Sequence, residues 1–229
     1  MPQLRLSRRL ASVLTAALVL AGCTYSGEPQ DPVSRRISYF SFLAADDIRA
    51  ACDSGASERY RLVYNADYSR QVRIYEIAID PTSGEGRLVT RVLGGERLGP
   101  FQFNFQSWLL EQASARTLLR PRDVQLVRDT LADAGFMERP PHRVALWSDD
   151  FYWLASGCAA GRFHQNGYAY PSERYERLGF ARVLATYDGS GIAFAERPPG
   201  DARVTAERRV PRVALETGKI EPFVYYIEP

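Results

Sequence analysis

Runs of Val, Ile and Tyr alternate with polar residues in the first part of the chain. Three such runs cover residues 59–64, 71–79 and 87–93. The turn-forming sequences NADYS and DPTSGEG lie between them. Runs of this composition, bounded by turn residues, predict β-strands. We therefore expect three antiparallel strands, the last two joined as a hairpin.

Apolar residues with helical spacing are clearest at positions 124, 127, 131 and 134. Pro121 suits the first turn of this helix, and Gly135 suits its end. Asp46 and Asp47 favour the start of a second, short helix that carries Cys52 near its end, because acidic side chains complement the helix dipole there. Residues 105–119 also have helical spacing. Ser172 is placed to cap one or two helical turns over residues 172–178.

The second half of the chain predicts further strands. Asn166-Gly167 is typical of a hairpin turn, and Asp188-Gly189-Ser190-Gly191 predicts another. The strands expected in this half cover residues 143–147 and 151–158 around the Ser148-Asp149-Asp150 turn, then 162–165, 181–187 and 192–196, and the closing strands 210–215 and 222–227. The predicted fold class is α+β, a single domain of antiparallel β-hairpins or a meander with two to four short helices.

The first 23 residues have a different pattern. Arg5, Arg8 and Arg9 precede an uncharged, mostly apolar run over residues 10–20, and no acidic residue comes before Cys23. A cationic head, a short apolar middle and small residues at a cleavage site are the three parts of a secretory signal. The apolar run is too short for a transmembrane helix, which needs about 20 residues.

Leu20-Ala21-Gly22-Cys23 resembles the lipobox of bacterial lipoproteins. The resemblance implies that residues 1–22 are a signal peptide and that Cys23 carries diacylglycerol on its sulfur and a fatty acid such as palmitate on its new amino group. Thr24, rather than aspartate, follows Cys23, which by the same resemblance implies the outer membrane, facing the periplasm. The alternatives are secretion without lipid and a cytosolic protein whose first residues match by chance.

Three regions follow from this pattern: the signal peptide (residues 1–22), the lipidated cysteine with a tether (residues 23–34), and one globular domain (residues 35–229). Residues 24–34 contain two prolines and no apolar periodicity, and eleven residues reach at most about 39 Å. Loss of the three signal arginines lowers the formal charge from +2 to −1. A near-neutral domain lacks the cationic field of nucleic-acid-binding proteins, so we expect no nucleic acid partner.

Cys52 and Cys158 remain once Cys23 is lipidated. An even pair of cysteines in an oxidising compartment predicts a disulfide. Closing a loop of this length stabilises a fold by about 4 to 5 kcal/mol in the chain-entropy model.

Polar and aromatic residues are densest in residues 157–180. We select Arg162, His164, Tyr168 and Arg174 as candidate ligand- or partner-binding residues, because arginines among tyrosines bind anionic or sugar-like groups through hydrogen bonds and cation–π contacts. The alternative is an ordinary hairpin with aromatic cross-strand pairs and a polar outer face.

Ser156-Gly157-Cys158 faintly resembles the Ser-His-Gly-Cys centre of the L,D-transpeptidases, without its histidine. A nucleophilic cysteine needs a base, for which only His142 and His164 are present. We expect no metal site and no cofactor, since the two histidines match no ligand spacing.

The favoured hypothesis is a non-catalytic binding or assembly module, held at the outer membrane by lipid, whose partner is an envelope protein or a cell-wall component. The alternative is a lipid-anchored cell-wall hydrolase or transferase that uses residues around Cys158 and His164. A bonded Cys158 favours the module, and a free thiol favours the enzyme.

Overall fold

The structure is a computed structural model that describes residues 43–67, 70–93, 111–140, 142–195 and 224–228. The predicted signal peptide, Cys23 and the tether lie outside these residues, so the lipoprotein hypothesis stays a prediction. The chain divides into two compact units, Met1–Asp47 and Ile48–Pro229. The sheets and the helices after residue 53 all belong to the second unit.

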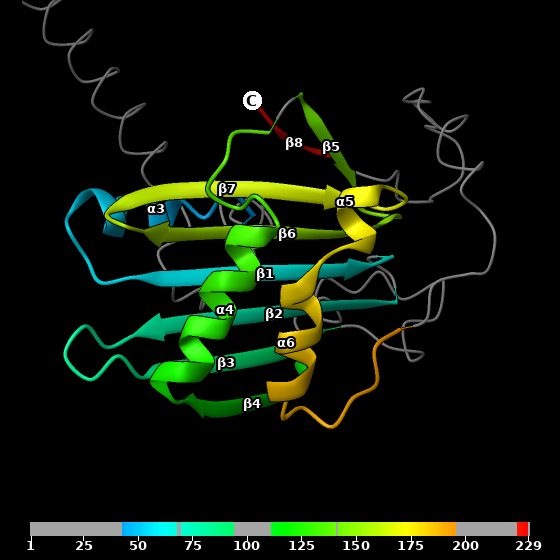
Figure 1. Cartoon of the computed structure of the whole chain (residues 1–229). Coiled ribbons are helices and arrows are strands. Elements are labelled where there is room, and N and C mark those ends of the chain that lie inside the picture. Colours follow the sequence, from blue (N-terminus) through cyan, green and yellow to red (C-terminus); the bar gives the residue numbers. More distant parts are fainter. Residues whose placement is uncertain (1–42, 68–69, 94–110, 141, 196–223, 229) are drawn as a thin grey trace, which may run out of the picture. The chain divides into compact units, whose positions relative to one another are not determined.

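A six-stranded sheet with antiparallel neighbours is the centre of the second unit. Its strand order is β4-β3-β2-β1-β6-β7 (Figure 1). The strands are β1 (Arg59–Ala66), β2 (Gln71–Ile79), β3 (Gly86–Leu93), β4 (Glu111–Leu119), β6 (Phe151–Ala159) and β7 (Arg162–Ala169). A second sheet pairs β5 (Val144–Trp147) with β8 (Val224–Ile227).

Two helices cover one side of the large sheet. In Figure 1, α4 (Pro121–Asp133) and α6 (Gly179–Tyr187) lie next to each other across the strands, and they pack on each other. The other described helices are α3 (Asp46–Asp53) and the one-turn α5 (Glu173–Glu176). The predicted α+β class is confirmed, with four helices among the described residues.

The main core lies between the sheet and these two helices. The sheet contributes alternate residues such as Leu62 and Trp153, and the helices contribute Leu131 and Phe180, all at most 3% exposed. The Trp153 and Phe180 rings meet edge to face, with centroids 5.4 Å apart. Burying a side chain of this size contributes about 1.5 to 3 kcal/mol. We call this side of the sheet the helix side.

The central strands are also buried on the opposite side of the sheet. Every residue of β6 is buried, and so are all residues of β1 after Arg59. Val63 and Leu154 face each other on this opposite side, each 1% exposed. Strands buried on both sides are apolar almost throughout, which explains the continuous apolar runs in the sequence.

The predicted helix over residues 105–119 is wrong for residues 111–119, which form β4; residues 105–110 lie outside the described residues. In this segment, more buried and more exposed residues alternate with a period of two, which is the pattern of a strand. Leu119 is fully buried on the helix side, and its neighbour Leu118 is 62% exposed on the opposite side. The helical spacing rested on the apolar residues at positions 105, 108, 109 and 113 and missed this alternation.

The hairpin predicted around residues 188–191 is also wrong. Residues 179–187 form helix α6, and residues 192–195 form no strand. Phe180 and Leu184, one helical turn apart, are both fully buried in the core, and this spacing places them on the same face of a helix. Of the two predicted closing strands, residues 224–227 form β8, and residues 210–215 lie outside the described part.

Asn166-Gly167 is not a turn, because it lies within β7. The chain turns instead at Ala160 and Gly161, whose φ angles are +50° and +71°. Gly167 is small for a packing reason: a Cβ there would lie 2.6 Å from Cδ1 of Ile227 in β8. Gly167 therefore allows the two-stranded sheet to approach β7 closely.

No helix among the described residues is both long enough and apolar enough to cross a membrane.

Candidate functional site

The four candidate binding residues do not form one site. Arg162 is exposed at the start of β7, His164 is half-buried, and Tyr168 is fully buried on the helix side. Arg162 and Tyr168 are six positions apart, which is about 20 Å along an extended strand. His164 packs against Phe136, with ring centroids 5.8 Å apart. The strand therefore distributes these residues along its length.

Tyr168 and Arg174 do come together. The Arg174 guanidinium lies 4.9 Å from the centroid of the Tyr168 ring and donates a hydrogen bond of 3.2 Å to Oδ1 of Asn166. Asn166 is itself fully buried, and its Nδ2 donates to the backbone oxygens of Gly135 and Glu138, at 3.0 and 2.9 Å. These contacts hold the turn that follows α4 against β7. Arg174 therefore helps to connect the turn after α4 with β7, a structural role that the sequence pattern did not reveal.

The hydroxyl of Tyr168 has no hydrogen-bond partner within the described part of the chain, although it is buried. Burial, together with the negative charge of Glu138, raises the pKa of Tyr168 despite the positive charge of Arg174. The phenol is therefore neutral at physiological pH. Its ring also packs against Phe180, at a centroid distance of 5.6 Å, so the residue belongs to the core.

The predicted disulfide is confirmed. Cys52 of α3 is bonded to Cys158 of β6, with Cα atoms 5.5 Å apart and a sequence separation of 106. A cation–π contact lies beside it, where the Arg49 guanidinium is 4.0 Å from the Phe163 ring centroid. The bond connects α3 covalently to a central region of the sheet.

Cys158 and His164 belong to opposite sides of the sheet. In the β6–β7 register, Cys158 faces Phe163, and Gly157 faces His164. Successive strand residues point to opposite sides, and facing residues share a side. His142, the other histidine, is exposed ahead of β5. The geometry therefore does not support a cysteine–histidine catalytic pair.

A row of mostly polar residues crosses the opposite side of the sheet. Each member faces the next across a pair of strands, so the row runs through all six strands. We call it the polar row, and from β7 to β4 it consists of Gln165, Ser156, Arg61, Glu76, Val89 and Arg116.

Hydrogen bonds join two neighbouring pairs of the polar row, Gln165 with Ser156 and Arg61 with Glu76. Gln165 donates to Oγ of Ser156 at 2.9 Å, and the hydroxyl of Tyr225 in β8 donates to Oε1 of Gln165 at 3.0 Å. Arg61 donates through Nε and Nη2 to Oε1 of Glu76, at 3.1 and 2.9 Å. Arg91 lies two residues after Val89 on β3 and forms an ion pair with the other carboxylate oxygen of Glu76.

One carboxylate thus serves two guanidinium groups. The Arg61 side chain is 3% exposed and that of Glu76 is 26% exposed. Burial raises the pKa of Glu76, but the charges and hydrogen bonds of Arg61 and Arg91 outweigh it and hold the pKa below its usual value. Glu76 is therefore ionised at neutral pH, and the three groups together carry one excess positive charge. The period-two placement of Arg61 and Glu76 in apolar strands is the signal that sequence reasoning missed.

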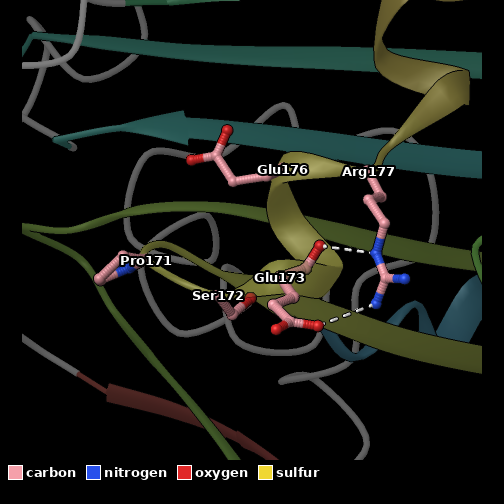
Figure 2. A pocket seen from close by; sticks show the side chains of 5 residues that line it. All are labelled: Pro171, Ser172, Glu173, Glu176 and Arg177. Carbon is pink, nitrogen blue, oxygen red and sulfur yellow. Dashed lines mark hydrogen bonds and ion pairs between the residues drawn. The ribbon is translucent and has the colours of Figure 1, made fainter.

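A shallow depression lies beside α5, as Figure 2 shows. Arg177 turns toward Glu173, with its Nη2 3.3 Å from Oε2 of that residue. Ser172 caps the helix as predicted, because its Oγ accepts from the Tyr175 backbone N–H at 3.1 Å. The lining residues are Pro171, Ser172, Glu173, Glu176 and Arg177, all exposed. A depression lined by a solvated ion pair does not resemble an active site.

Within the described ranges, no group of three or more His, Cys, Asp or Glu side chains is placed to bind a metal ion.

No protein-family model, no curated protein and no solved structure matches this chain.

Proposed function

We propose that the protein is a lipoprotein of the bacterial envelope, anchored through lipid on Cys23, whose folded domain is a non-catalytic binding or assembly module. The anchor lies in the outer membrane, and the domain faces the periplasm. Its partner is an envelope protein or a cell-wall component. No cofactor takes part.

The Cys52–Cys158 disulfide is the observation that carries the proposal. Disulfides persist in oxidising compartments such as the periplasm, which agrees with an export signal at the N-terminus. The chain contains three cysteines, and the disulfide uses two of them. Cys23 is the remaining one, and it stands where a lipobox requires a cysteine.

The same bond weakens the alternative of a cell-wall hydrolase or transferase. A cysteine nucleophile acts as a thiolate, and the sulfur of Cys158 is bonded to Cys52. The candidate base His164 belongs to the other side of the sheet, as the strand register shows. A binding module needs neither group to be reactive.

The experiment is metabolic labelling with radioactive palmitate in the native host, followed by membrane fractionation. The wild-type chain should incorporate label and fractionate with the outer membrane. Cys23→Ala should lose both label and membrane attachment, whereas Cys52→Ala, a matched cysteine loss, should keep the label. Label retained by Cys23→Ala would contradict the proposal. Thr24→Asp should move the labelled protein to the inner membrane.

A further inference from the structure

Strand β4, which ends the strand order of the large sheet among the described residues, carries with β3 an exposed cationic and apolar surface. On the side that bears the polar row, β3 and β4 present Arg91, Ser114, Arg116 and Leu118, which we call the β3–β4 patch. The Leu118 residue is 62% exposed and the Arg91 side chain is 36% exposed. Ser114 faces Arg91 directly, and Arg116 is its diagonal neighbour.

The positive charge of the patch is not balanced by nearby carboxylates of the row. Glu76 is the one carboxylate of the polar row, and both the buried Arg61 and Arg91 pair with it. Arg116, next to it on β4, is exposed and forms no ion pair within the described part of the chain. Diagonal neighbours in an antiparallel pair are about 7 to 8 Å apart, so Arg91 and Arg116 can bind anionic groups side by side.

We propose that the β3–β4 patch docks on the anionic lipid headgroups of the membrane that holds the protein. Arg91 and Arg116 bind headgroup phosphates, and Leu118 enters the interfacial layer, as apolar side chains of peripheral proteins do. The inference rests on the proposed lipid anchor, because two arginines and one leucine are too few to hold an unanchored protein at a membrane.

The anchor makes this weak contact effective. Nineteen residues separate Cys23 from Leu43, the first residue that the structure describes. Even fully extended, they keep Leu43 within about 70 Å of the bilayer. Docking is then intramolecular. The high effective concentration of the patch near the bilayer compensates for its weak affinity for the headgroups. The ion pair with Glu76 further favours docking, because it holds Arg91 in place before the lipid binds.

The test uses the lipidated mature protein, reconstituted into vesicles of phosphatidylcholine alone or mixed with phosphatidylglycerol. Phenylglyoxal modifies accessible arginines, and mass spectrometry gives the rate at each one. Arg116 should react at least about fivefold more slowly on the anionic vesicles, the factor that one arginine near an anionic surface provides. Arg182, exposed on α6 on the helix side, should react equally fast on both.

Two charge reversals sharpen the test. Arg116→Glu should abolish the protection of Arg91 on anionic vesicles, and Arg182→Glu should leave the protection of Arg91 and Arg116 intact. High salt should remove the protection, because it screens exposed charges.

Equal rates at Arg116 on both kinds of vesicle would overturn the docking and leave the anchor standing. Protection of Arg116 only after an acidic protein is added would assign the patch to a protein partner and overturn the docking as well. A mature chain that fails to float with phosphatidylcholine vesicles has no lipid, and that result would overturn both proposals.

Discussion

Arg73 and Asp188 form an ion pair in the protein interior, 115 positions apart in sequence. The Arg73 side chain is fully buried, and that of Asp188 is 6% exposed. Tyr75, next to Arg73 on the helix side of β2, donates its hydroxyl to the same carboxylate oxygen at 2.6 Å. The pair therefore connects the end of α6 to the middle of the sheet.

The rest of the Arg73 guanidinium is also satisfied. It donates to the backbone oxygens of Ile192 and Ala193, the latter at 2.8 Å, and the Phe194 ring centroid lies 4.1 Å from its central carbon. One buried arginine thus contacts the segment from Asp188 to Phe194, directly after α6. Burial raises the pKa of Asp188, but hydrogen bonds from Ser190 and Tyr75 and the charge of Arg73 lower it below its usual value.

Asp188→Ala should therefore destabilise the protein strongly. It leaves the Arg73 charge buried without a counter-ion, and breaking a buried pair in this way costs about 3 to 5 kcal/mol. Urea denaturation should show a loss of that size in the free energy of unfolding. The matched control is Glu173→Ala, which breaks an exposed ion pair with Arg177 and should change stability by at most about 0.5 kcal/mol. Equal effects of the two substitutions would contradict the role of the buried pair.

The disulfide should account for much of the stability of the domain. Cys158→Ala should lower the free energy of unfolding by about 2 to 5 kcal/mol. The native protein should contain no alkylatable thiol at Cys52 or Cys158 until it is reduced, and reduction should add the mass of two hydrogens. A fast-reacting thiol at Cys158 in the native protein would contradict the bond and favour the enzyme.

Asp123 should make the protein sensitive to acid through its link between the two core helices. The hydrogen bond from Arg120 lowers the pKa of Asp123 to about 2, with a further contribution from the Tyr187 hydroxyl at the end of α6. The pKa of an unfolded aspartate is about 3.9. Because the folded value is lower, the ionised group stabilises the fold above about pH 4, and this contribution disappears as the pH falls toward 2.

Tyr187→Phe should raise the pKa of Asp123, because it removes one hydrogen bond to the carboxylate. Titration of the carboxyl carbon by NMR measures this directly. Tyr226→Phe removes the same kind of group from the exposed Tyr226 of β8 and should leave the pKa of Asp123 unchanged. An unaltered titration in Tyr187→Phe would show that the hydroxyl does not act on Asp123.

Arg162 and Arg174 should respond differently to substitution by alanine. Arg162 is exposed on β7, so Arg162→Ala should leave stability within about 0.5 kcal/mol and weaken partner capture if residues 157–180 form the binding surface. Arg174→Ala should lower stability by about 1 kcal/mol or more, since it leaves the buried Oδ1 of Asn166 without this donor. Thermal unfolding and cross-linking in intact cells give the two readouts. Normal capture by Arg162→Ala would exclude Arg162 from the binding surface.

The interpretation of residues 157–180 as a site shows where sequence reasoning fails. Density along the chain placed Arg162, His164, Tyr168 and Arg174 together. Arg162, His164 and Tyr168 do share one side of β7, but an extended strand separates residues by about 3.3 Å each, so Arg162 and Tyr168 lie near opposite ends of the strand. Tyr168 is consequently in the core, while Arg162 is in solvent. The polar row was missed for the complementary reason, because its members come from strands that are far apart in sequence.

The sequence by itself determined what depends on neighbours along the chain. Strands β1 to β3, helix α4, the Ser172 cap and the α+β class follow from local periodicity and turn residues, and the count of cysteines predicted the disulfide. Tertiary structure decided where the local signal was ambiguous. Residues 111–119 became the edge strand β4, because β3 offered a partner for their backbone groups, and residues 179–187 became α6, because a helix buries Phe180 and Leu184 together. The pairing of Arg61 with Glu76 depended on strand register, which is set by packing across the whole sheet rather than by any single segment. The pairing of Arg73 with Asp188 depended on where the end of α6 lies over β2.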